Sequence, residues 1–186
     1  MTPSFKTLGS ALLLASVIYS CGDSGADNTN ETADTTAQQQ AAPAPDTVNM
    51  PALVVAQPDG SLLMTAENGK AIGPDIKYMP EWRAFGWFTA KDSVEWDVDV
   101  PAAGDYTVTL EWSVSDEEAG KEFILTAGDQ QLTGKVDKSG SWETFKTADV
   151  GKIKLNQGRQ KLVFKSKTKF DKGAILDFRQ IKLTRA

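Results

Sequence analysis

A chain of 186 residues with a formal net charge of −5 has room for one domain plus appendages. It contains no histidine and a single cysteine, Cys21, which excludes Ser-His-Asp and Cys-His catalytic arrangements, His-ligated zinc and an intramolecular disulfide. Catalysis by carboxylates alone remains open.

Residues 1–20 have the features of a signal peptide. Lys6 gives a short positive region, and the apolar run at residues 8–18 is shorter than the roughly 20 residues of a membrane-spanning helix. Residues 17–21, Val-Ile-Tyr-Ser-Cys, resemble the lipobox of bacterial lipoproteins. The resemblance implies a lipid on Cys21, and several buried acyl chains would anchor the protein on a membrane. We expect a place in the bacterial cell envelope, periplasmic or at the cell surface.

Residues 21–50 are interpreted as the lipidated cysteine followed by a flexible linker. They are rich in Ala, Thr, Asp, Asn, Gln and Pro and lack apolar periodicity, so no buried core can offset the entropy lost on ordering. The folded domain is predicted to occupy residues 51–186.

Within that domain, short strands separated by turn residues are predicted. The expected strands cover residues 52–56, 61–66, 85–89, 93–100, 106–114, 123–126, 131–136, 144–148, 152–155, 161–166 and 174–183. Residues 73–91 are expected to be a long irregular loop that leads into the strand at 85–89. Short strands at a spacing of about 8–12 residues predict an all-β antiparallel sandwich of the jelly-roll type.

Residues 92–114 are the strongest part of this pattern. Apolar and polar side chains alternate before and after a turn at residues 101–105, as expected for two half-buried strands. Trp96 and Trp112 fall in phase with the apolar positions, which assigns both to the core. We interpret the two strands as a hairpin with one shared buried face.

Charge is distributed unevenly along the domain. Residues 51–130 contain five Lys or Arg and fifteen Asp or Glu, whereas residues 131–186 contain fourteen and five. A basic stretch can indicate nucleic-acid binding. In a sandwich, however, acidic and basic strands can pair across a sheet, and an exported protein rarely meets nucleic acid. We therefore expect no nucleic-acid partner.

Four phrases of the domain resemble the family 6 carbohydrate-binding modules and their galactose-binding-like β-sandwich relatives. They are residues 62–67, the stretch 86–114, residues 139–145 and residues 176–183. The resemblance covers about residues 60–186 and implies a non-catalytic protein that binds a poly- or oligosaccharide.

The resemblance also implies a sugar site. Sugars in such modules often stack on two aromatic residues, which would be Trp87 and Trp142, and accept or donate a hydrogen bond at a polar residue, for which Asp177 lies closest. Indole rings offer a flat apolar surface to the C–H face of a sugar. The alternative for Trp142 is that it caps the end of the core.

A structural calcium ion is the cofactor that the resemblance implies. Its ligands would be Glu67, after the opening strand, and Asp177, at the last strand, completed by backbone carbonyls. The alternative is two unrelated surface carboxylates, or ion pairs with Arg179 or Lys70.

Two other hypotheses use the acidic residues of the 92–114 stretch. If Glu95, Asp97, Asp99 and Glu111 share one face, two of them could form the carboxylate pair of a glycoside hydrolase. We favour a solvated acidic face and expect no enzyme. The second hypothesis is a module that docks a protein partner in the envelope through Glu95 or Glu111.

Overall fold

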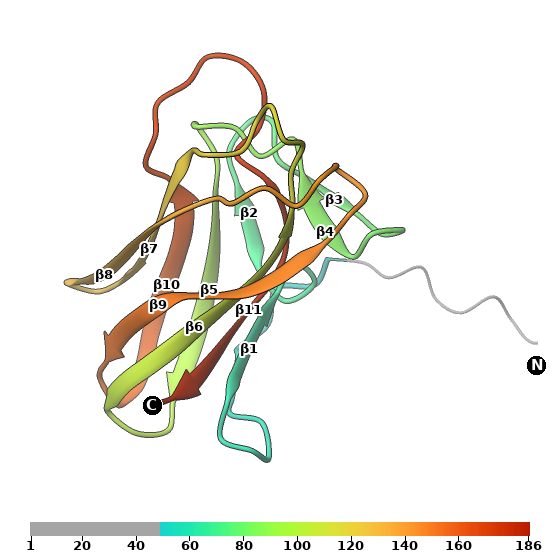
Figure 1. Ribbon diagram of the computed structural model, residues 1–186. Coiled ribbons are helices and arrows are strands. Elements are labelled where there is room, and N and C mark those ends of the chain that lie inside the picture. The colour runs from blue at the N-terminus through green and yellow to red at the C-terminus, as the bar shows by residue number, and fades with distance from the viewer. Residues whose placement is uncertain (1–48) are drawn as a thin grey trace, which may run out of the picture. The chain divides into compact units, whose positions relative to one another are not determined.

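The computed structural model describes residues 49–186, so the predicted signal peptide, Cys21 and almost all of the linker lie outside the described residues. Eleven strands in this part of the chain form two antiparallel sheets (Figure 1). The predicted all-β antiparallel sandwich is therefore confirmed. Between residues 49 and 186, no helix is long and apolar enough to cross a membrane.

Sheet I has the order β3-β4-β11-β6-β9, with β1 also paired to β11. Its strands are β1 (Leu62–Thr65), β3 (Lys77–Met79), β4 (Ala84–Gly86), β6 (Gly104–Ser113), β9 (Lys146–Leu155) and β11 (Asp177–Arg185). Sheet II has the order β2-β5-β10-β7-β8. Its strands are β2 (Lys70–Ile72), β5 (Ser93–Val100), β7 (Glu122–Ala127), β8 (Gln130–Lys135) and β10 (Gly158–Ser166).

The core fills the space between the two sheets. Trp96 of sheet II meets Phe178 of sheet I with ring centroids 5.3 Å apart, and Phe164 of sheet II lies 5.4 Å from the same Phe178 ring. Trp96 and Trp112 are both buried, as predicted, and each indole N–H donates to a backbone carbonyl, of Thr65 and Asp137 respectively. Satisfying these N–H groups removes the cost of burying them.

The interpretation of residues 92–114 as a hairpin is wrong. β5 pairs with β10 and β2 in sheet II, whereas β6 pairs with β11 and β9 in sheet I. The connection at residues 101–103 therefore crosses from one sheet to the other. Alternation in the sequence identifies the buried side of each strand but not the neighbour to which the strand bonds.

Three strand boundaries also differ from the prediction. Residues 73–91 contain β3 and β4 rather than one strand at 85–89. Residues 52–56 form only a bridge, in which Val54 pairs with Val98. Residues 144–148 and 152–155 belong to one strand, β9, which a register shift opposite Val108 and Thr109 interrupts. Such an irregularity resets the alternation and makes one strand look like two.

The four acidic residues considered for a hydrolase do not all share a face. Glu95, Asp97 and Asp99 lie on β5 of sheet II, whereas Glu111 lies on β6 of sheet I, and the buried residues between them face the interior from opposite sides. Glu111 is therefore separated from the other three, whereas Glu95 and Asp97 lie on one face of β5 and both pair with Lys161. The two positions proposed for a protein partner likewise lie on different sheets.

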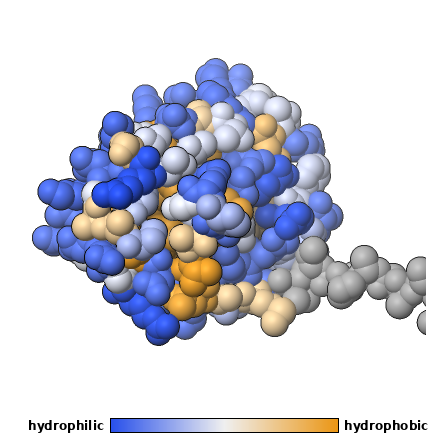
Figure 2. Space-filling view, turned by 90° about the horizontal axis from the view of Figure 1, so that it is seen from below, coloured by the Kyte–Doolittle hydropathy of each residue, from blue (hydrophilic) through white to orange (hydrophobic). Residues whose placement is uncertain are grey.

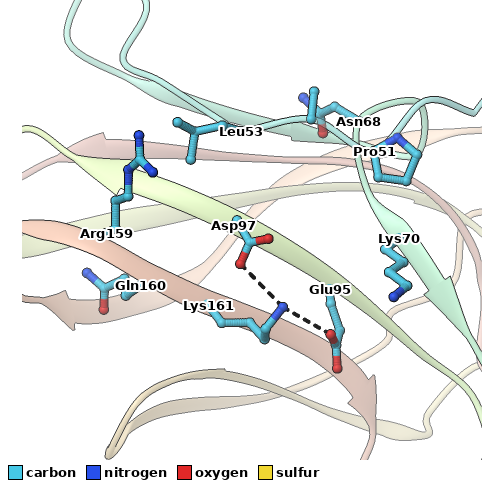
Figure 3. A pocket seen from close by; sticks show the side chains of 10 residues that line it. Pro51, Leu53, Asn68, Lys70, Glu95, Asp97, Arg159, Gln160 and Lys161 are labelled. Atoms are coloured by element: carbon cyan, nitrogen blue, oxygen red, sulfur yellow. Dashed lines mark ion pairs between the residues drawn. The ribbon is translucent and has the colours of Figure 1, made fainter.

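As expected, acidic and basic strands pair across sheet II. Lys161 of β10 lies 3.2 Å from the Glu95 carboxylate and 3.3 Å from that of Asp97 on β5 (Figure 3). Hydrogen bonding to Glu95, and then to Asp97, raises the pKa of the Lys161 ammonium group. These residues line a hollow of about 490 Å³ on the outside of the sheet.

The segment that enters the domain leaves apolar side chains in solvent. Met50, Leu53 and Val55 are exposed, while Val54 between them is buried against β5. Figure 2 shows hydrophobic atoms gathered near the start of the described chain, on a face that is otherwise mainly hydrophilic.

Candidate functional site

Loops from separate parts of the chain form a groove at one end of the sandwich. The loop between β10 and β11, drawn in orange-red at the top of Figure 1, contributes one wall. The groove has a volume of about 700 Å³, and Trp87, Trp142 and Asp177 all line it. The structure thus brings together the three residues that the sequence predicts for ligand binding.

Trp87 follows β4 and projects into solvent. Its side chain is 57% exposed, and its backbone is left-handed, with φ of 51°. This conformation costs a non-glycine residue roughly 1–2 kcal/mol, and a bulky residue rarely adopts it. The Lys77 ammonium lies 5.5 Å from the centre of the indole ring. Strain that holds a large apolar ring in solvent is typical of a functional position.

Trp142 is anchored more firmly than Trp87. The Ser113 hydroxyl, at the end of β6, donates to the Trp142 carbonyl at 2.6 Å, and the preceding loop is tied down where the Val114 N–H donates to the Ser139 hydroxyl. The side chain is half-buried and packs against the core. Trp142 therefore caps the core, which is the alternative given for it, and it also lines the groove.

Asp177 opens β11, next to Gly86 of β4. A Cβ atom at Gly86 would lie 3.1 Å from the Asp177 carboxylate and 2.8 Å from the Met79 sulfur, so the missing side chain keeps this part of the groove open. Burial raises the pKa of Asp177 to about 7. None of the hydrogen bonds and ion pairs found among residues 49–186 involves its carboxylate.

The groove is also lined by charged residues that the sequence did not identify. Asp75 comes from the loop after β2, Glu118 from the turn after β6, and Asp171 and Lys172 from the loop after β10. They are distant in sequence and carry no motif of their own, so only the three-dimensional arrangement shows that they belong together.

Two buried or half-buried groups fix these loops. The buried Asp92 carboxylate accepts hydrogen bonds from the backbone N–H and the hydroxyl of Thr89, and also from the backbone N–H of Asp75. On the other wall, the Lys121 ammonium pairs with Glu118 and donates to the Ala174 carbonyl at 3.0 Å. These hydrogen bonds and this ion pair hold the loops that form the groove in place.

Glu67 does not lie in this groove. Arg83 binds both of its carboxylate oxygens, at 2.6 and 2.7 Å, and the Tyr78 hydroxyl donates to one of them at 3.4 Å. The hydrogen bond from Arg83 is the main reason that the pKa of Glu67 is lowered. Glu67 lines a hollow of about 270 Å³ that does not include Asp177.

The predicted calcium site does not fit these surroundings. Arg83 already supplies a positive charge to Glu67, a partner other than the expected alternatives Arg179 and Lys70. Within residues 49–186, no group of three or more carboxylates or thiols is arranged to hold a metal ion. A calcium ion at Glu67 would have to displace the Arg83 guanidinium.

Trp82 and Glu111 belong to a separate cluster on sheet I. The Trp82 ring stacks on Phe145 with centroids 6.2 Å apart, and the Arg179 guanidinium lies 3.4 Å from the centre of the Phe145 ring. Arg179 also pairs with Glu111 at 2.7 Å. The charged groups of this cluster therefore pair with each other, and Arg179 also donates to the Trp82 carbonyl at 3.1 Å.

The geometry of the groove suits a polyhydroxylated ligand. Two indole rings offer flat apolar surfaces. An ionised Asp177 carboxylate accepts hydrogen bonds only, and hydroxyl groups are natural donors to it. Catalytic arrangements that depend on histidine or cysteine are excluded among the described residues, because histidine is absent and cysteine occurs only at position 21.

Comparison with known proteins found carbohydrate-binding modules. The family model described as carbohydrate binding module (family 6) matches residues 65–185. A family 35 module from Clostridium thermocellum has a TM-score of 0.55 and 14% identity, covering 68% of this chain and 98% of that one. The C-terminal family 6 module of LamC, a laminarinase from Zobellia galactanivorans, has 0.56 and 16%, covering 67% and 99%.

A third similar structure contains a ligand. It is a carbohydrate-binding module of Cellvibrio mixtus lichenase 5A in complex with cellotriose, with a TM-score of 0.54 and 16% identity, covering 67% of this chain and 96% of that one. Among curated proteins, none matches the sequence. At these identities, the three structures establish a shared fold.

Proposed function

The chain belongs to the family 6 carbohydrate-binding modules, and we propose that it binds a poly- or oligosaccharide in the groove through Trp87, Trp142 and Asp177. The family is non-catalytic, so binding is the whole activity of the domain. The observation that carries the proposal is the convergence of these three residues, from three separate segments, on one groove.

Each residue has a distinct part in the proposed site. The exposed Trp87 ring and the more rigid Trp142 ring provide stacking surfaces for successive or opposite faces of sugar residues. The Asp177 carboxylate accepts hydrogen bonds from sugar hydroxyls and orients the ligand. A carboxylate acceptor forms stronger hydrogen bonds than a neutral one, and half-burial strengthens them further.

A glycan array followed by calorimetry tests the proposal. The full chain is screened against neutral and charged glycans, with cello-oligosaccharides included because a similar module binds cellotriose. We expect Trp87→Ala and Trp142→Ala each to weaken the strongest interaction about tenfold or more. Trp82→Ala is the matched control, because Trp82 is a partly exposed indole outside the groove.

Two outcomes count against the proposal. One is that no glycan binds; the other is that the tryptophan variants in the groove bind as tightly as the unaltered chain. Because Trp142 also packs against the core, its variant must first be shown by thermal melting to be folded. Trp87 is mostly in solvent, so its variant avoids this difficulty.

We further propose that the domain is anchored in the cell envelope by a lipid on Cys21. The support is the lipobox-like sequence at residues 17–21 and the linker composition of residues 22–50. Metabolic labelling with an alkyne-tagged palmitate should mark the chain, and Cys21→Ser should lose the label and leave the membrane fraction. An unlabelled chain that remains in the membrane fraction would contradict lipid anchoring.

Family 6 modules often bind a structural calcium ion, but the arrangement around Glu67 leads us to expect none at that position. Addition of calcium, or of a chelator, should then leave the melting temperature unchanged. A ligand that binds only the native state raises stability. A calcium-dependent rise that disappears in Glu67→Gln would restore the predicted site.

A further inference from the structure

Asp177 lacks the cationic partner that several other acidic residues on the sheets have. Glu95 and Asp97 share the Lys161 ammonium, Glu111 binds Arg179, and Glu122 lies 3.5 Å from Lys167. Asp177 is half-buried and has no such partner in the described chain. A carboxylate that has lost water without gaining a cation or a donor gains most from a ligand that supplies one.

The groove around Asp177 is also rich in negative charge. Asp75 and Asp171 line it without an ion pair, and the Thr89 hydroxyl that lies 3.3 Å from Asp75 is shared with the buried Asp92. Glu118 is neutralised by Lys121. The cations nearby are Lys172, on the loop after β10, and Lys77, whose ammonium lies over the Trp87 ring.

Lys77 also indicates which chemistry this surface accepts. Its ammonium group is 5.5 Å from the centre of the Trp87 indole, within the range of a cation–π interaction. An ammonium group can therefore approach the aromatic wall of the groove. Anionic ligands are disfavoured, because the carboxylates of Asp75, Asp171 and Asp177, which have no ion pair, repel them.

We propose that the groove selects glycans with amino sugars, and that the carboxylate of Asp177 binds the ammonium group of one amino-sugar residue while Trp87 and Trp142 stack on the rings. This inference rests on the proposed function of the groove. An ammonium group brings positive charge and three N–H donors to a carboxylate that has neither. An N-acetylated or uncharged sugar offers a neutral donor only, and a uronic acid adds a further negative charge.

Calorimetry with three matched oligosaccharides tests this selectivity. The probes are β-1,4-linked tetramers of glucose, glucosamine and N-acetylglucosamine, which share a backbone and differ in the substituent at C2. With the full chain at about pH 7 and low salt, we expect the glucosamine tetramer to bind about tenfold more tightly than the glucose tetramer. The preference should weaken as salt is raised.

Asp177→Asn is the decisive variant, because it removes the charge and keeps the shape. It should reduce the preference for the glucosamine tetramer over the glucose tetramer to about twofold or less, whatever its effect on the affinity for the neutral tetramer. Asp99→Asn is the matched control: it changes the net charge of the chain equally on the outer face of sheet II and should retain the full preference. This control excludes nonspecific attraction between a cationic oligomer and an acidic protein.

The inference and the proposed function fail in different ways. Failure of the glucosamine tetramer to bind more tightly than the glucose tetramer overturns the inference, and so does a preference that survives in Asp177→Asn. If another glycan still binds in a manner that depends on Trp87 and Trp142, the proposed function stands without the inference. If the unaltered chain binds no glycan at all, both the inference and the proposed function are overturned.

Discussion

Two hollows on this domain have charged linings, but their charges are arranged differently. In the hollow on the outside of sheet II, Lys161 lies between Glu95 and Asp97 and pairs with both (Figure 3). In the groove at the loop end, the Asp177 carboxylate has neither an ion pair nor a hydrogen bond among the described residues. The exposed Trp87 lines the same groove. The first arrangement is complete without a ligand, whereas the second is not.

The comparison indicates how to separate a structural charge cluster from a binding site. Exposed ion pairs contribute little to stability and need no ligand. A half-buried carboxylate without a partner and a solvent-exposed indole with a strained backbone both reduce the stability of the free domain. Features that cost stability and are not compensated within the fold are the ones that a ligand can explain.

Charge reversal in the two hollows should give the largest contrast. Asp177→Lys replaces the proposed acceptor with a long cationic side chain in the groove, so we expect glycan binding to fall at least about tenfold. Glu95→Lys makes the equivalent change beside Lys161, outside the groove, and binding should stay within about twofold of the original. Calorimetry on both variants measures this contrast, and equal losses would show that the two hollows do not differ as proposed.

The pH dependence of stability should separate Asp177 from the paired acids. Its folded pKa of about 7 lies above the value of about 3.9 for an unfolded aspartate. The folded state therefore retains a proton that the unfolded state has lost, so the free energy of unfolding falls as the pH rises between these values. Asp177→Asn cannot ionise and should be more stable than the unaltered chain at about pH 8, by ~1 kcal/mol after allowance for solvent contact.

Urea unfolding at about pH 5 and pH 8 measures this effect. The advantage of Asp177→Asn should be clearly smaller at the lower pH, where the unaltered Asp177 is mostly protonated in the folded state. Asp99→Asn, on the outer face of sheet II, serves as the control for the change in net charge. An equal advantage of Asp177→Asn at both pH values would contradict the elevated pKa.

How far the sequence predicted the molecule depends on the range of each interaction. The alternation around Trp96 and Trp112 predicted their burial, because alternation reports the local orientation of side chains. It could not show that β5 and β6 belong to different sheets, because hydrogen-bonding partners lie far away in the sequence. The pairing of Glu67 with Arg83 was missed for a related reason, since it depends on the fold of residues 73–91.

The groove shows the same limit. Phrases that resemble a known family led to Trp87, Trp142 and Asp177, and these three do lie together. Asp75, Asp171 and the loop-fixing pair of Glu118 and Lys121 belong to no phrase. The charge of the groove, which determines the class of ligand, could therefore be read only from the folded chain.

Backbone strain at Trp87 makes a further contrast with Trp82, a tryptophan whose backbone is not left-handed. At position 87, glycine should be more stable than alanine by about 1 kcal/mol, because φ of 51° penalises any side chain. At position 82, the order should reverse, because glycine there only adds freedom to the unfolded chain. Thermal melting of the four variants measures both orders, and alanine more stable than glycine at position 87 would contradict the strain.

The smallest effect is expected from the completed charge cluster itself. Lys161→Met removes the ammonium that Glu95 and Asp97 share and keeps most of the side chain. Since these groups are largely solvent-exposed, we expect a loss of less than about 1 kcal/mol, decreasing as salt is raised, and unchanged glycan binding. Urea unfolding at two salt concentrations measures the loss. A large loss of binding in this variant would move the ligand site to the hollow on sheet II, because Lys161 lines that hollow.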